Sequence, residues 1–70
     1  MLVKIYQLGM EAQYAAHVLL LWNEGEYPCD LRVRRARTPG LIVIELDNLE
    51  LANKIATATR CRVAVKEVKA

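Results

Sequence analysis

Four arginines between residues 32 and 37 are the side chains in this sequence most suited to binding chemistry. Arg32 and Arg34 alternate along a strand-like segment, and Arg35 and Arg37 follow toward a turn. Guanidinium groups at this spacing can follow a chain of phosphates, and an aromatic ring beside them can stack on a base. The alternative is a solvated hairpin whose charges prevent edge-to-edge pairing. The predicted RNA-binding residues are Lys4, Tyr6, Arg32, Arg34, Arg35 and Arg37.

Residues for catalysis or metal binding are few. Cys29 and Cys61 are isolated from each other, and His17 is the single histidine, so the sequence offers no zinc-ligand set. No spacing of Ser, His, Cys and Asp indicates a nucleophile, and no glycine-rich loop could hold a phosphate. We therefore expect no enzyme activity, no metal and no cofactor. Two reduced thiols are expected, with a Cys29–Cys61 disulfide as the alternative.

Composition indicates one small domain, residues 1–70, that is expected to be soluble and cytoplasmic. Apolar residues make up 54% of the 70, and the net charge is +2, too mild to predict nucleic-acid binding by itself. The first residues lack the pattern of a signal peptide. The apolar run at residues 15–22 is too short to cross a bilayer.

The segment 10–23 is predicted to form a helix that is apolar almost all the way round. A helix on the surface of a monomer needs one buried stripe, and a chain this short has little core to cover two. The second face therefore predicts a partner, either another copy of the chain or a paralogous subunit. The two stripes are Ala12, Ala15, Ala16, Leu19 and Trp22, and beside them Tyr14, Val18 and Leu21.

Alternating side chains predict three strands around this helix. In the first, residues 2–8, Val3 and Ile5 are expected to face the core, which turns Lys4 and Tyr6 outward.

The segments 30–37 and 41–46 form the other two strands, joined as a hairpin by the turn Thr38–Gly40. Leu31 and Val33 are expected to point inward and the arginines between them outward. Glu45 is expected on the exposed face near Lys4 or Arg34, where a cross-strand ion pair could form.

A second helix is predicted to begin at Asn48. Asp47 and Glu50 have the spacing of a capping box, and Leu46 and Leu51 that of a hydrophobic staple. No Gly, Pro, Asp or Asn follows between residues 54 and 70 to end the helix.

Residues 61–68 nevertheless alternate like a strand. The fold class is therefore α+β, a small antiparallel-rich sheet packed on two helices, in one of two forms. One is a ferredoxin-like βαββαβ, and the other is βαββ followed by a long C-terminal helix.

The helix-opening segment 47–52 resembles the small dimerisation subunit of the KEOPS complex (the CTAG/Pcc family). Leu49, Leu51 and Arg60 match the family pattern, whereas Ala52 stands where the family usually has Arg. The resemblance implies a long terminal helix and a non-catalytic subunit. Such a subunit would pair through its helices and support an enzyme that makes threonylcarbamoyladenosine in tRNA.

A fainter similarity, to a small eukaryotic-type large-subunit ribosomal protein, covers Val33, Arg34 and Arg37 and the ending 63–69, which is a strand in that family. It implies an RNA-binding module, which remains the alternative to an assembly subunit. For the assembly subunit, the predicted partner-contacting residues are Tyr14, Val18, Leu21, Trp22, Ile55, Thr59 and Val63.

Overall fold

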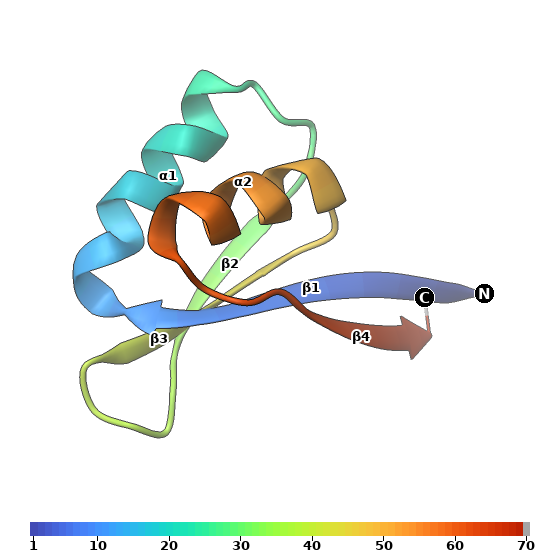
Figure 1. Cartoon of the computed structure of the whole chain (residues 1–70). Coiled ribbons are helices and arrows are strands. Elements are labelled where there is room, and N and C mark those ends of the chain that lie inside the picture. The colour runs from blue at the N-terminus through green and yellow to red at the C-terminus, as the bar shows by residue number, and fades with distance from the viewer. Residues whose placement is uncertain (70) are drawn as a thin grey trace.

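A computed structural model describes residues 1–69. The chain forms a four-stranded antiparallel sheet with both helices on one face (Figure 1), so the fold is α+β with ferredoxin-like topology. The strand order is β2-β3-β1-β4. The elements are β1 (Leu2–Glu11), η1 (Ala12–Tyr14), α1 (Ala15–Glu24), β2 (Leu31–Arg35), β3 (Leu41–Leu46), α2 (Leu49–Thr59) and β4 (Ala64–Lys69).

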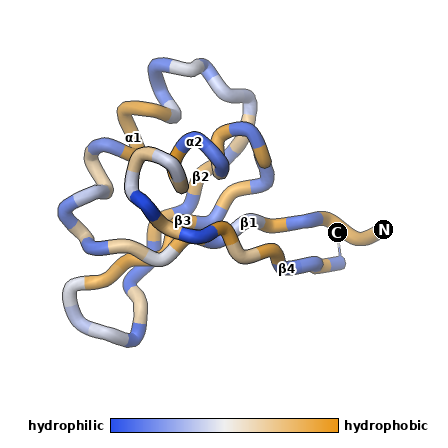
Figure 2. Tube along the Cα trace, in the orientation of Figure 1, coloured by the Kyte–Doolittle hydropathy of each residue, from blue (hydrophilic) through white to orange (hydrophobic). Residues whose placement is uncertain are grey.

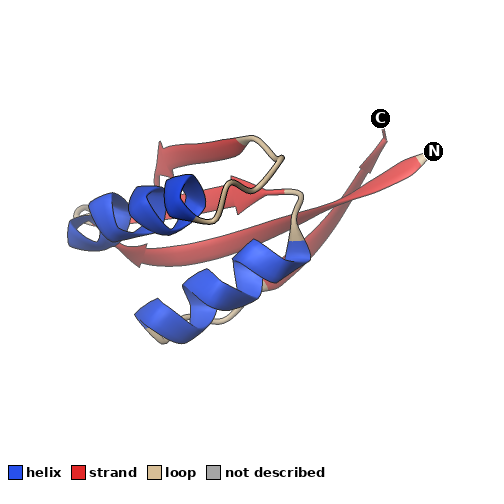
Figure 3. Ribbon diagram, turned by 90° about the horizontal axis from the view of Figure 1, so that it is seen from above, coloured by secondary structure: helices blue, strands red, loops and turns tan. Residues whose placement is uncertain are grey.

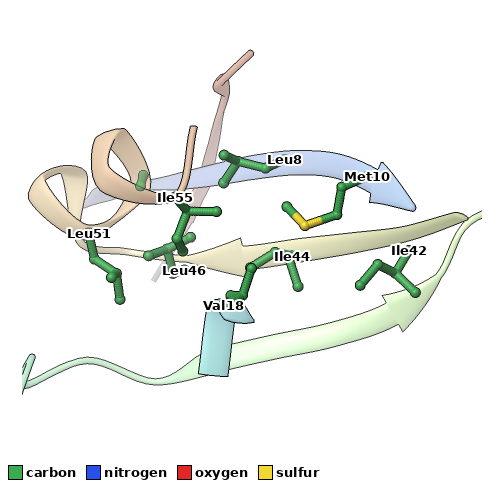
Figure 4. Packing of buried hydrophobic residues seen from close by; sticks show 9 residues of the cluster. Leu8, Met10, Val18, Ile42, Ile44, Leu46, Leu51 and Ile55 are labelled. Atoms are coloured by element: carbon green, nitrogen blue, oxygen red, sulfur yellow. The ribbon is translucent and has the colours of Figure 1, made fainter. Parts of the chain in front are cut away.

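The core lies between the helices and the central strands β1 and β3 (Figure 4). Leu8 of β1 pairs with Ile44 of β3, and Met10 pairs with Ile42. Val18 of α1 packs onto these pairs, and all five side chains are buried. The rest of the buried cluster is Leu46 of β3 and Leu51, Ala52 and Ile55 of α2.

The first strand is longer than predicted and faces the other way. Met10 was expected in a helix, but β1 continues to Glu11 because its last residues pair with β3. Tyr6 shares the helix-covered side with Leu8, so Val3 and Ile5 lie on the open side of the sheet, which contradicts the prediction. Because side chains alternate along a strand, an error about which face one residue occupies reverses the assignment of every other residue in that strand.

The hairpin and the turn Thr38–Gly40 are confirmed. Leu41 N–H donates to the Thr38 carbonyl at 3.2 Å, and Gly40 has a φ of 84°. The strand β3 spans the predicted residues, and β2 is shorter than the predicted segment 30–37. A positive φ at Gly40 is accessible because glycine has no Cβ.

The second helix begins one residue later than the capping-box prediction. Asn48, not Asp47, is the N-cap, and its side chain accepts a hydrogen bond from Leu51 N–H at 3.0 Å. The predicted pairing of Asp47 with Glu50 is therefore wrong. With Asn48 as the cap, Glu50 lies in the first turn of α2, where its negative charge stabilises the helix by interacting with the positive end of the helix dipole.

The C-terminal segment is a strand, so the ferredoxin-like alternative is confirmed and the long helix is not formed. The helix α2 ends at Thr59, and Arg60 adopts a left-handed conformation with φ 56° and ψ 35°. The chain then reverses, and β4 pairs antiparallel with the first half of β1, for example Tyr6 with Val65.

The first half of β1 and the strand β4 extend together past the helices (Figure 3), and Figure 2 shows both apolar and hydrophilic residues along this arm. Within residues 1–69, no helix is both long enough and apolar enough to cross a membrane.

Candidate functional site

The arginines lie along β2, the outer strand next to β3. Arg32 pairs in register with Glu45, and Arg34 pairs with Val43 on the same open side of the sheet, as predicted. Arg35 points to the helix side by strand alternation, and Arg37 lies in the turn region beyond β2. All four are exposed. The structure therefore presents these charges at one edge of the sheet.

Glu45 connects this edge to the centre of the sheet. Its Oε1 accepts from Arg34 Nε at 3.0 Å, and its Oε2 accepts from Gln7 Nε2 at 2.6 Å. These hydrogen bonds hold the pKa of Glu45 below its ordinary value, and the bond from Gln7 has the larger effect. The predicted pairing of Glu45 with Arg34 is confirmed.

The Arg34–Glu45 pair is the one ion pair found within the described residues. Arg32, Arg35 and Arg37 thus have no acidic side chain within salt-bridge distance in that part of the chain.

Lys4 and Tyr6 do not join the arginines. They belong to the helix-facing side of β1, opposite to Arg32 and Arg34, and β3 separates β1 from β2. Tyr6 is also partly buried against the core. The predicted six-residue RNA surface is therefore divided between two faces. Because Tyr6 is on the other side, it cannot stack on a base whose phosphates contact Arg32 and Arg34.

A hollow of about 370 Å³ opens on the uncovered side of the sheet. Arg32 and Lys66 contribute positive charge to it, and the carboxylates of Asp30, Glu45 and Asp47 contribute negative charge. Opposite charges of similar number give no strong preference for an anion or a cation. Its lining residues are Ile5, Asp30, Arg32, Glu45, Leu46, Asp47, Lys66 and Val68.

The thiols do not form a reactive centre. Both Cys29 and Cys61 are free. Burial, and then the nearby carboxylates of Asp47 and Asp30, raise the pKa of the Cys29 thiol, which favours its unreactive protonated form. Residues 1–69 contain no cluster of His, Cys, Asp and Glu that could hold a metal ion.

Several predicted partner-contacting residues belong to the chain's own core. Val18 and Ile55 are fully buried, and Thr59 is nearly so, with its hydroxyl donating to the Ile55 carbonyl at 2.7 Å. Because these three side chains are buried within the chain, a partner cannot contact them in this fold, and the prediction that they lie in an interface is wrong. The remaining four, which pack partly against the core, are Tyr14, Leu21, Trp22 and Val63.

The most exposed large apolar side chains of α1 and β2 are not among the predicted partner-contacting residues. Leu19 and Leu20 of α1 are 43% and 50% exposed. Val33 of β2 points to the helix side as predicted, yet it is 43% exposed. Seen from above in Figure 3, α1 lies toward the middle of the sheet and leaves β2 uncovered. Leu19 and Leu20 could have been found from the surplus apolar face of the helix, but the exposure of Val33 follows only from the position of α1.

Comparison with known proteins extends the description of the fold. No protein-family model matches the chain, and no curated protein matches its sequence. The structure is similar to protein BT0572 from Bacteroides thetaiotaomicron, with a TM-score of 0.65 and 12% identity over 96% of this chain. That match covers 49% of BT0572, so this chain spans about half of its length. A de novo designed protein, Foldit4, matches at a TM-score of 0.47 and 9% identity over 99% of this chain and 97% of its own. The similarity to BT0572 concerns the fold alone.

Proposed function

We propose that this domain is a non-catalytic assembly module that pairs with a second copy of itself through α1. The observation that carries the proposal is the composition of α1. This helix holds two alanines, three leucines, Val18 and Trp22, and only Val18 is buried. Burying a leucine fully contributes about 1.5–3 kcal/mol, so Leu19 and Leu20 favour association. A paralogue with the same helix would occupy the same surface.

The contact must extend beyond these two leucines. A stable interface buries about 800 Å² on each partner, out of a total surface of 5215 Å² for this chain. Ala16 is exposed one turn before Leu19 and Leu20 in α1 and would extend this surface.

A role in a KEOPS-like assembly that modifies tRNA is the narrower form of this proposal. Leu49, Leu51 and Arg60 support it by their similarity to that family. The strand β4 departs from it, because the resemblance implies a long terminal helix where α2 ends at Thr59.

The test is the mass of the protein in solution, measured by light scattering over a dilution series. We expect a dimer for the natural sequence and a monomer for Leu20→Glu, because a carboxylate at a buried contact loses its water. The matched control is Leu49→Glu at the start of α2, where the leucine is 49% exposed and a carboxylate suits the helix N-terminus. It should remain dimeric. A mass of one 7.9 kDa chain for the natural sequence at every concentration contradicts pairing through α1.

A further inference from the structure

The outer edge of β2 has the backbone of a strand that can accept another strand. Its five residues, Leu31–Arg35, pair with β3 on one side, and no described strand pairs with the other side. The segment contains neither proline nor glycine, so its unpaired N–H and C=O groups continue without interruption. An extended peptide could add to the sheet here by backbone hydrogen bonds.

One side of this edge is apolar. Val33 is 43% exposed on the helix side, and Leu31 is partly buried beside it. Trp22 of α1 donates its Nε1–H to the Cys29 carbonyl at 3.0 Å, which places this side of α1 next to the segment that leads into β2. Leu19 lies one turn earlier on the same side of the helix. Together Val33, Leu31, Trp22 and Leu19 form an apolar surface beside the edge of β2, the apolar shoulder, on which aliphatic groups of an added strand could pack.

The other side of the edge is positively charged. Arg32 and Arg34 share the open side of β2, and Arg34 alone is paired with an acid of the described chain. If two copies joined by antiparallel β2 strands with Val33 opposite Val33, Arg32 of each copy would oppose Arg34 of the other. Like charges directly opposite each other destabilise a sheet. This edge therefore disfavours a second copy and favours a strand of negative charge.

We propose that the β2 edge binds an extended segment of a partner protein that carries acidic side chains at alternate positions and aliphatic side chains between them. The acidic groups would meet Arg32 and Arg34, and the aliphatic groups would pack on Val33 and Leu19. This interaction goes beyond the proposed pairing through α1, since its partner is different and its backbone and charge contacts lie on β2; Leu19 is the one side chain that both would use. A peptide is favoured over RNA because the apolar shoulder suits aliphatic groups, and Tyr6 lies on the other face from these arginines.

The probe is a fluorescent peptide of alternating Glu and Val, compared by anisotropy with one of alternating Lys and Val. We expect the Glu peptide to bind about tenfold or more tightly, with an affinity that falls as salt is added. Amides of β2 should become protected from hydrogen exchange in its presence. In the double variant Arg32→Glu with Arg34→Glu, the preference should reverse toward the Lys peptide. The single variant Arg32→Glu leaves the Arg34–Glu45 pair in place, and it should weaken binding of the Glu peptide on its own.

A control with the same change of charge is Arg62→Glu with Lys69→Glu, two exposed residues away from β2. It should retain the natural preference. Equal binding of both peptides, no binding of the Glu peptide, or binding of a single-stranded RNA in its place would overturn the proposal. Repeating the titration with Leu20→Glu separates the two ideas, because strand addition at β2 should persist in a protein that no longer pairs through α1.

Discussion

Replacing Arg60 with glycine is expected to stabilise the protein. Arg60 ends α2 in the left-handed region, with φ 56° and ψ 35°, and its N–H donates to the Ala56 carbonyl. A residue with a Cβ loses roughly 1–2 kcal/mol in this conformation, whereas glycine adopts it freely but costs about 0.5–1 kcal/mol more in chain entropy on folding. The net gain is about 0.5–1 kcal/mol, which for a domain of this size raises Tm by roughly 2–8 °C.

The sign of the change distinguishes the two forms of the C-terminal segment. If α2 continued through Arg60 as one long helix, glycine would lie in a helix interior and cost about 1 kcal/mol, so Tm would fall. Thermal unfolding followed by circular dichroism measures the shift, and the helical signal before unfolding should stay unchanged. Arg62→Gly is the control, because Arg62 does not have a positive φ and its replacement should not raise Tm. A lower Tm for Arg60→Gly would refute the described end of α2.

Two further predictions concern hydrogen bonds. Asn48→Ala should cost about 1 kcal/mol in urea unfolding, because it removes the cap on Leu51 N–H, and Asn48→Asp should retain most of that stability; equal stability of all three proteins would contradict the cap. The lowered pKa of Glu45 means that its contribution is present above its ordinary pKa of 4.5 and is lost as the pH falls through the lower value in the folded state. The Glu45→Gln variant should therefore lose less stability than the natural sequence as the pH falls below about 4.5. If the free energy of unfolding of both proteins fell equally in acid, groups other than Glu45 would control the loss.

Local patterns predicted the elements whose ends are set by local chemistry. The strand β3 and the turn at Gly40 were correct because the turn residues determine where the hairpin reverses. The first strand was predicted too short, since its continuation to Glu11 depends on pairing with Leu41, thirty residues away. The faces of β1 were reversed for the same reason. Alternation separates two sets of side chains, but only contact with α1 and α2 decides which set is covered.

The end of α2 shows a different limit. The sequence has no glycine or asparagine after Thr59, so no helix-stop signal is present. The chain turns at Arg60 because the segment that follows gains backbone hydrogen bonds along one side by pairing with β1. The stabilisation of a strand by a distant neighbour outweighs the cost of one arginine in a left-handed conformation.

The candidate site was predicted in part. Arg32 and Arg34 were placed correctly because strand alternation holds within β2. Glu45 pairs with Arg34 across the hairpin. Lys4 and Tyr6 were misplaced with the rest of β1. For the helix, the surplus of apolar residues was visible in the sequence. Which stripe packs on the sheet was not, because that depends on how α1 lies over β1 and β3.

The two edges of the sheet differ in a way that bears on specificity. On β4, Lys66 and Glu67 carry opposite charges on opposite faces of the sheet, so an added strand of either sign would be attracted at one of them and repelled at the other. On β2, every charged side chain is an arginine. An acidic strand therefore gains at Arg32 and Arg34 on the open side of β2, while a second β2 strand paired through Val33 is repelled at both. The same charges that prevent pairing of β2 with itself can thus select an acidic partner, and the apolar shoulder left by α1 would fix which face of that partner turns inward.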